Sequence, residues 1–253
     1  MKTPQNKGNF ATMNSESPPT TSIDHEHPDV TGGWLRPAVF GAMDGLVSNL
    51  ALIAGVAGGT RDSAGSSAVV LAGLAGLAAG AFSMAAGEYT SVASQSEAAE
   101  REIEKERIEI LRNPEAETLE LAAMYVKKGI DKDLADAVAR QVHRDADNAV
   151  NVHAREELGV DPGDLASPMV AAVSSFLSFA LGALVPVLPY LIGASTLLPG
   201  LVITLVALFA CGAVVTQVTN REWWYGGLRQ MLLGMAAAAL TYAVGAAVGA
   251  NLG

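Results

Sequence analysis

A thioether and a carboxylate share one helical face inside a long apolar stretch. Met84 and Glu88 lie four residues apart in AFSMAAGEY, and residues at i and i+4 lie on the same side of a helix. Asp44 lies in a second apolar stretch, MDGLVSNLALIAGV. An ionised, unpaired carboxylate is costly at membrane depth, so it is rare there unless it lines a pathway or binds a partner. We expect protons and divalent cations to compete for these acids.

Glu88 and the nearby polar residue Asn49 each allow two interpretations. Glu88 could instead mark the headgroup boundary where the helix leaves the membrane. Asn49, about one turn beyond Asp44, could line the same path or only bond a neighbouring helix.

The elements that carry these residues have the length of membrane spans. The chain has 253 residues and is 50% hydrophobic, yet its net charge is −10, so the charged residues must be segregated. A helix needs roughly 20 apolar residues to cross a bilayer. The alternative, buried helices of a large soluble protein, fits poorly with spans joined mostly by short loops. Five stretches qualify: 37–59, 67–94, 168–193, 196–218 and 231–252.

Lys and Arg distribution predicts the orientation of these spans. Arg61 is the only basic residue on one side, whereas the N-terminal segment, the long insert and the loop with Arg221 and Arg229 hold the others. The positive-inside rule therefore places the N-terminus and the insert in the cytoplasm. We expect a multi-pass protein of a bacterial inner (plasma) membrane, with the lipid bilayer as partner and no nucleic-acid partner.

The composition divides the chain into four regions. Residues 1–33 read as a disordered polar tail, in which His25-Glu26-His27 is more often incidental than a metal site. Residues 34–96 hold the first two spans, 97–167 an acidic cytoplasmic insert, and 168–253 the last three spans. Cys211 is the only cysteine, which excludes a disulfide within the monomer. The predicted fold class is an all-α membrane protein with five transmembrane helices.

The insert contains 18 acidic residues against 10 basic ones, and we expect three helices in it. The first continues from the second span without a breaker. Asn113 and Pro114 favour the start of the second, and Gly129 favours its end. The third is predicted to run from Asp131 to Gly159.

Acidic pairs recur at helical spacing on these three helices. Folding the helices together would make a cluster of oxygen ligands with the Met124 thioether and the His153 imidazole, a donor set suited to iron(II) or manganese(II). The alternative is a solvated acidic surface in which Glu pairs with Lys and Arg. The candidate ligands are Glu106, Glu109, Glu117, Glu120, His153 and Glu157.

Several stretches resemble the vacuolar iron transporter family, which includes the yeast vacuolar iron and manganese carriers. They are RPAVFGAMDGLVSNLALIAGVAGG, AGLAGLAAGAFSMAAGEYTSVASQSE, and the NP-acid and EELG segments of the insert. The resemblance implies a homodimer of five-span subunits that moves divalent metal out of the cytosol in exchange for protons. It also implies that Asp44, Met84 and Glu88 line the path, and that Glu106, Glu109, Glu117, Glu120 and Glu157 bind metal in the insert.

This chain departs from the family at one ligand position. Where some members place a Met pair upstream of the last Glu, it has His153 and Ala154, which leaves the preference between iron and manganese open.

The resulting expectation is a transporter of iron(II) or manganese(II) without a prosthetic group. Enzyme chemistry is not expected, because the chain has four His and no G-x-S-x-G motif. A membrane-anchored metal sensor or buffer is the alternative, but it would not require Asp44 and Met84 inside the spans.

Overall fold

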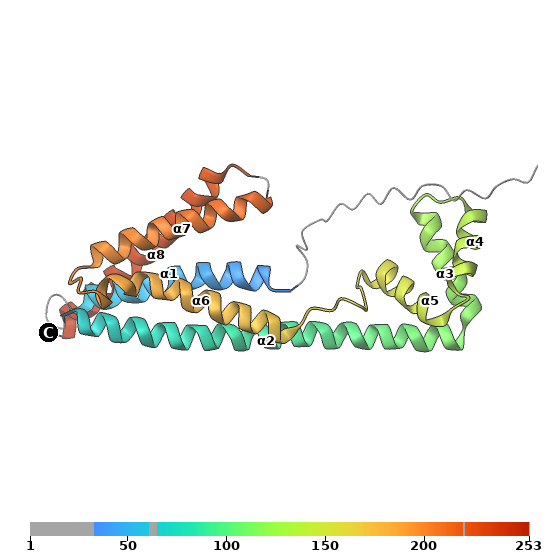
Figure 1. Cartoon of the computed structure of the whole chain (residues 1–253), viewed down its shortest axis with the longest axis horizontal. Coiled ribbons are helices and arrows are strands. Elements are labelled where there is room, and N and C mark those ends of the chain that lie inside the picture. The colour runs from blue at the N-terminus through green and yellow to red at the C-terminus, as the bar shows by residue number, and fades with distance from the viewer. Residues whose placement is uncertain (1–32, 61–64, 220, 253) are drawn as a thin grey trace, which may run out of the picture.

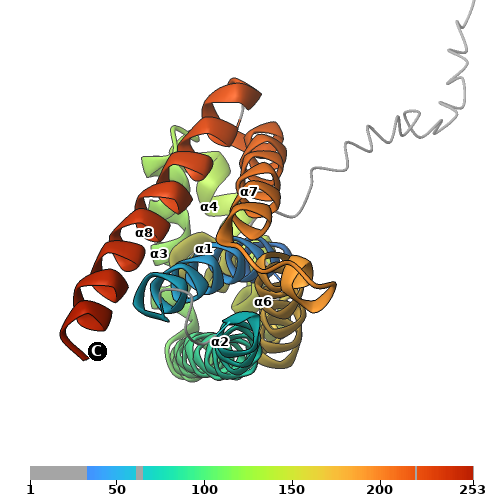
Figure 2. The same ribbon diagram turned by 90° about the vertical axis from the view of Figure 1, so that its left-hand side faces the viewer.

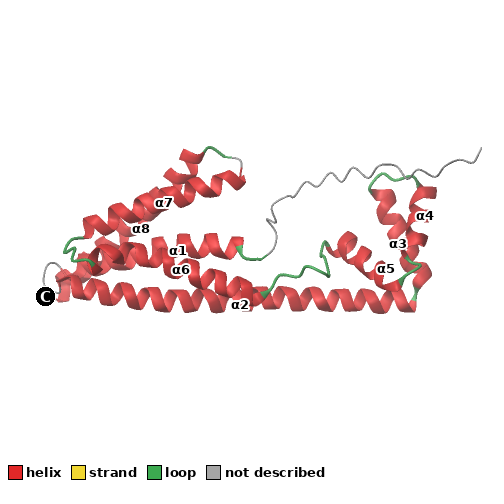
Figure 3. Cartoon of the chain, in the orientation of Figure 1, coloured by secondary structure: helices red, strands yellow, loops and turns green. Residues whose placement is uncertain are grey.

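The computed structural model describes residues 33–60, 65–219 and 221–252. Within these ranges the chain forms helices joined by loops and contains no strand (Figure 3), which confirms the all-α prediction. The expectations for the tail, including His25-Glu26-His27, and for Arg61 lie outside the described residues.

Five helices are long and apolar enough to cross a membrane, as predicted. They are α1 (Leu35–Thr60), α2 (Gly65–Arg112), α6 (Pro168–Leu191), α7 (Leu197–Thr219) and α8 (Trp223–Leu252).

The start expected for the fifth span was wrong, because α8 begins eight residues earlier, at Trp223. The pair Gly226-Gly227 does not interrupt this helix. Gly226 instead lies against the backbone of α7, where an added Cβ would be 2.5 Å from the carbonyl oxygen of Gly212. The glycines therefore allow two helices to approach closely.

Helix α1 lies at the centre of the membrane bundle. It packs against α6 on one side and α8 on another, and α6 also packs against α2 (Figure 2). Ile53 of α1, Val69 of α2, and Val187 and Tyr190 of α6 form one of the buried apolar clusters. These contacts pack α1, which carries Asp44, against α2, which carries Met84, and against α6.

The contact between α1 and α6 depends on small residues. Gly45 lies so close to α6 that an added Cβ would be 2.8 Å from the backbone nitrogen of Ala183. Gly41 is equally constrained, since its Cβ would lie 2.7 Å from the carbonyl oxygen of Ser175. The backbones touch here, so no side chain can move aside to accept a larger residue.

Helix α2 leaves the membrane bundle and continues without a break into the insert (Figure 1). Its 48 residues span about 72 Å at 1.5 Å per residue. At the end of this extension α3 (Pro114–Lys127) and α4 (Lys132–Val142) pack against each other and project from α2. The chain then returns along α2 as α5 (Ala146–His153) and a π-helical turn, η1 (Ala154–Leu158). Pro114 is the first residue of α3, as predicted, although the Asn113 side chain makes no capping bond.

The prediction of one helix from Asp131 to Gly159 was wrong. The segment breaks after Val142, and Asp145 begins α5 by accepting a hydrogen bond from the backbone nitrogen of Asp147. Asp residues compete for backbone donors in this way, which favours a helix start over continuation. The break turns α5 back onto α2, where Arg107 donates to Asp147 at 2.6 Å.

We expect Gly45→Val to destabilise the membrane bundle. The added side chain collides with the backbone of α6, and overpacking typically costs about 1–3 kcal/mol. Gly87→Val is the matched control, because a Cβ at Gly87 meets nothing within 4 Å. Thermal unfolding in detergent should show a lower midpoint for Gly45→Val than for Gly87→Val. Equal midpoints would contradict the proposed close contact.

Candidate metal-binding sites

A cavity of about 250 Å³ opens between α1, α2 and α6 within the membrane bundle. It brings together Asp44 and Met84, which the sequence placed on separate spans. Glu88 does not line it, although it follows Met84 by one turn on α2. The lining residues are Asp44, Ser48, Asn49, Leu52, Gly76, Gly80, Ser83, Met84 and Phe179.

Sequence reasoning missed several of these lining residues. Ser48 follows Asp44 by one helical turn and donates its hydroxyl to the Asp44 carbonyl oxygen at 2.6 Å. Ser83 precedes Met84 in the chain. The spacing could have indicated both, whereas Phe179 reaches the cavity from α6 and carried no local signal.

A second group of ligand side chains lies in the insert. Glu106 of α2, His153 of α5 and Glu157 of η1 each offer one ligand atom, and these atoms lie within 4.8 Å of one another. The closest pair is His153 Nδ1 and Glu106 Oε1 at 2.7 Å. Neither atom has a partner with hydrogen-bond geometry. Two ligand atoms converging in this way can serve one cation.

The remaining predicted acids surround this group. Charge repulsion from Glu157, Glu117, Glu109 and Glu120 acts on Glu106, so all five carboxylates lie near one another. The structure thus gathers the six candidate ligands of the insert, which we call the insert cluster. Met124 does not belong to the insert cluster, because it packs against the apolar contact between α3 and α4.

Burial, reinforced by the neighbouring carboxylates, raises the pKa of Glu106 to about 7. The pKa values of Glu117 and Glu157 are also raised, first by burial and then by their acidic neighbours. Burial lowers the pKa of His153 to about 4, with a smaller contribution from His143. Both shifts favour the neutral forms of Glu106 and His153. A divalent cation would replace the Glu106 proton and compensate the acidic charge.

His143, which the sequence did not single out, packs edge-to-face against His153 with ring centroids 5.1 Å apart. Its Nδ1 lies 3.0 Å from the carbonyl oxygen of Ala139. A carbonyl only accepts, so Nδ1 carries the proton and donates. His143 therefore helps to hold the His153 ring in place.

The π-helical turn η1 positions the last ligand. It widens the backbone after His153, and such turns are frequent at functional sites. Arg155 and Lys128 fasten it through ion pairs with Asp161 and Glu156. Glu157 is left free to face the cluster.

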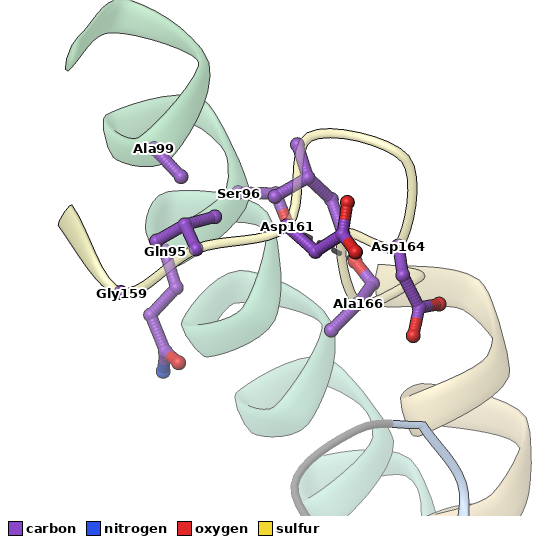
Figure 4. A pocket seen from close by; sticks show the side chains of 9 residues that line it. Gln95, Ser96, Ala99, Gly159, Asp161, Asp164 and Ala166 are labelled. Carbon is purple, nitrogen blue, oxygen red and sulfur yellow. Dashed lines mark hydrogen bonds between the residues drawn. The ribbon is translucent and has the colours of Figure 1, made fainter. Parts of the chain in front are cut away.

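A further cavity of about 350 Å³ lies where the segment after η1 passes along α2 (Figure 4). The Ser96 hydroxyl donates to the carbonyl oxygen of Ala166 at 2.9 Å and ties this segment to α2. Asp161 lines the cavity, but its carboxylate already pairs with Arg155 and the backbone nitrogen of Gly163. We therefore interpret this cavity as part of the contact that attaches the segment to α2, and we do not assign it as a ligand site.

The pKa of Glu106 predicts a pH dependence of the metal-free insert. A carboxyl group with a raised pKa favours the folded state at low pH, and this contribution is lost as the pH rises from about 4.5 through 7. His153 acts oppositely, because its lowered pKa destabilises the fold as the pH falls from 6.5 toward about 4. Glu106→Gln removes only the first effect, so it should stabilise the insert more at pH 8 than at pH 5, by at most about 3 kcal/mol.

Amide hydrogen exchange in α3 and α5 of chelator-treated full-length protein measures this difference. Parent and variant are compared at the same pH, which removes the intrinsic pH dependence of exchange. A stabilisation by Glu106→Gln that is equal at the two pH values would contradict the raised pKa.

Comparison with known proteins agrees with this architecture. The model of the VIT family matches residues 35–246. A vacuolar iron transporter of Acanthamoeba castellanii is 39% identical over 85% of this chain and 78% of its own length. Proteins named vacuolar iron transporter 1 from Oryza sativa subsp. japonica and Arabidopsis thaliana are 31% and 30% identical, each over 88% of this chain and 90% of their own length. With five long apolar helices and a match over most of its length, the chain belongs to the VIT family.

Proposed function

We propose that this protein carries iron(II) or manganese(II) across a membrane, out of the cytosol, in exchange for protons. The observation that carries the proposal is the cavity inside the spans that Asp44 and Met84 line together. The relatives named vacuolar iron transporters support metal transport and iron as the cargo.

The two side chains suit transient metal binding. The Asp44 carboxylate alternates between a proton and a metal ion, which couples the two fluxes in opposite directions. The Met84 thioether is a soft, neutral donor that favours iron(II) over magnesium or calcium without adding charge. Glu88, if it takes part, acts outside this cavity, at the cytoplasmic side of the same helix.

The insert is the metal-loading domain in this proposal. Its excess of acidic residues attracts cations, and the insert cluster provides convergent ligands. The Lys and Arg distribution puts the insert in the cytoplasm, so loading precedes export. Where some family members have a Met thioether, this chain has the imidazole of His153. The ligands of the loading site are therefore of intermediate rather than soft character.

The alternative functions fit these observations less well. A membrane-anchored sensor or buffer needs the insert cluster but not a cavity with an acid and a thioether within the spans. We further propose a homodimer in the bilayer, as the family resemblance implies. These relatives are eukaryotic and named vacuolar, so they do not support the expected bacterial plasma membrane.

Asp44→Asn tests the path. The amide keeps the shape but loses both the charge and the exchangeable proton, so metal flux into proteoliposomes should fall at least about tenfold, the equivalent of 1.4 kcal/mol. In the parent, the compartment that the metal leaves should acidify. Glu222→Gln, an exposed acid outside the cavity, is the control. Near-normal flux in Asp44→Asn, or parent flux without proton movement, would refute exchange at this site.

Met84→Leu separates a ligand from a packing residue. The volume is nearly conserved, so stability should change by less than about 1.5 kcal/mol. Flux of iron(II) should fall more than flux of manganese(II), the harder ion. Equal losses for both metals would show that the sulfur atom is not a ligand.

Replacing four acids of the insert with Ala tests the loading role. The full-length variant should bind fewer metal ions by calorimetry, and it should retain transport at high metal concentration because the path is intact. Binding that matches the parent would mean that these acids form a solvated surface. The four residues are Glu106, Glu109, Glu117 and Glu120.

A further inference from the structure

We propose that Asn49 supplies a fixed amide-oxygen ligand for the metal ion in the membrane cavity, beside Asp44 and Met84. The inference rests on the proposed function, because it assumes that this cavity is the metal path. It assigns Asn49 a role in cation binding in addition to its contacts between helices.

Two hydrogen bonds fix the orientation of the Asn49 amide. Nδ2 donates to the carbonyl oxygen of Gly73 on α2 at 3.2 Å and to that of Ala183 on α6 at 2.5 Å. Both partners are carbonyls, which only accept, so a flipped amide would place Oδ1 against two oxygens. Nitrogen and oxygen are therefore assigned unambiguously, and the side chain cannot rotate without losing both bonds.

Those same bonds leave Oδ1 beside Gly76 of α2, where an added Cβ would lie 2.8 Å from it. Asn49 is 2% exposed, and Oδ1 is buried without a hydrogen-bond partner. A buried carbonyl oxygen with no donor is unfavourable, and few such groups persist in folded proteins. Asn49 is one of the residues that line the cavity shared by Asp44 and Met84. A cation there would satisfy the unpaired oxygen.

Gly76 is in close contact with this oxygen. A Cβ added at Gly76 would lie 2.8 Å from Asn49 Oδ1, and it would also collide with the Leu52 side chain, which lines the same cavity. A larger residue at position 76 would therefore displace the amide oxygen or Leu52.

The resulting donor set has a clear chemical meaning. A carboxylate oxygen, an amide oxygen and a thioether sulfur suit a partly dehydrated first-row divalent ion. The amide replaces part of the hydration shell without a second negative charge. Affinity therefore stays moderate, which a transported ion requires in order to leave.

Gly76→Ala tests the ligand by crowding Asn49 Oδ1. The methyl group displaces the oxygen, so the KM for manganese(II) flux in proteoliposomes should rise at least about fivefold, with a smaller change in maximal rate. Gly87→Ala on the same helix is the matched control, since its methyl meets nothing within 4 Å. An unchanged KM in folded Gly76→Ala would overturn the proposal.

A spectroscopic measurement covers the case in which Gly76→Ala fails to fold. Full-length protein with ¹³Cγ-labelled asparagine, and with Gln at the four Glu positions of α2 and α3 in the insert cluster, is loaded with manganese(II). Coordination by Asn49 predicts a strong ¹³C coupling in electron–nuclear double resonance, lost in Asn49→Leu. Bound manganese without this coupling, or no bound manganese, would overturn it.

The outcome of Asp44→Asn distinguishes a failure of the Asn49 ligand assignment from a failure of the proposed metal path. If Asp44→Asn stops transport while Gly76→Ala and the ¹³C spectrum show no role for Asn49, only the ligand assignment fails. If Asp44→Asn transports normally, the metal path itself is elsewhere.

Discussion

One unbroken helix fixes the distance between the two candidate metal sites. Met84 and Glu106 both lie on α2, 22 residues apart in the sequence, which corresponds to about 33 Å along the axis. No proline lies between them, and the helix is continuous through Gly87. The membrane cavity and the insert cluster therefore cannot meet through bending of α2. A metal ion bound in the insert must be released before it enters the membrane.

Release and entry place different demands on the two ligand sets. The insert lies beside water and gathers five carboxylates, whose repulsion is relieved by protons or by a cation. The cavity lies among apolar helices and offers a single carboxylate, with neutral oxygen and sulfur donors around it. Each extra charge at membrane depth would be costly when the ion has left. A charge-rich loading site and a charge-poor path follow from their surroundings.

The fold was predictable where the signal was local. Apolar runs of the right length indicated five spans, and the uninterrupted charged stretch after Ser94 indicated that α2 continues into the insert. The break before Asp145 was missed because a side-chain cap outweighed helix propensity there. The α8 start was missed because the charge-free apolar run begins only after Arg229, whereas the helix itself extends back to Trp223.

For the candidate sites too, features set by local sequence were predictable and features set by packing were not. Spacing on single helices pointed to the Glu pairs, His153 and Met84, since i, i+3 and i, i+4 neighbours are visible in a sequence. Two other features depend on how separate helices rotate against one another. Asp44 and Met84 line one cavity that Glu88 does not reach, and Met124 packs in the apolar contact between α3 and α4 instead of joining the insert cluster. Only packing fixes those angles.

Asn49 shows how packing can make a ligand from a structural residue. Its amide joins α1 to α2 and α6 through two carbonyls, and this use of the nitrogen leaves the oxygen unpaired and immobile. In water such an oxygen would be solvated, but in this bundle of apolar helices it is buried beside Gly76, in a residue that lines the membrane cavity. The bonds that hold the helices together thereby also orient a donor toward the ion.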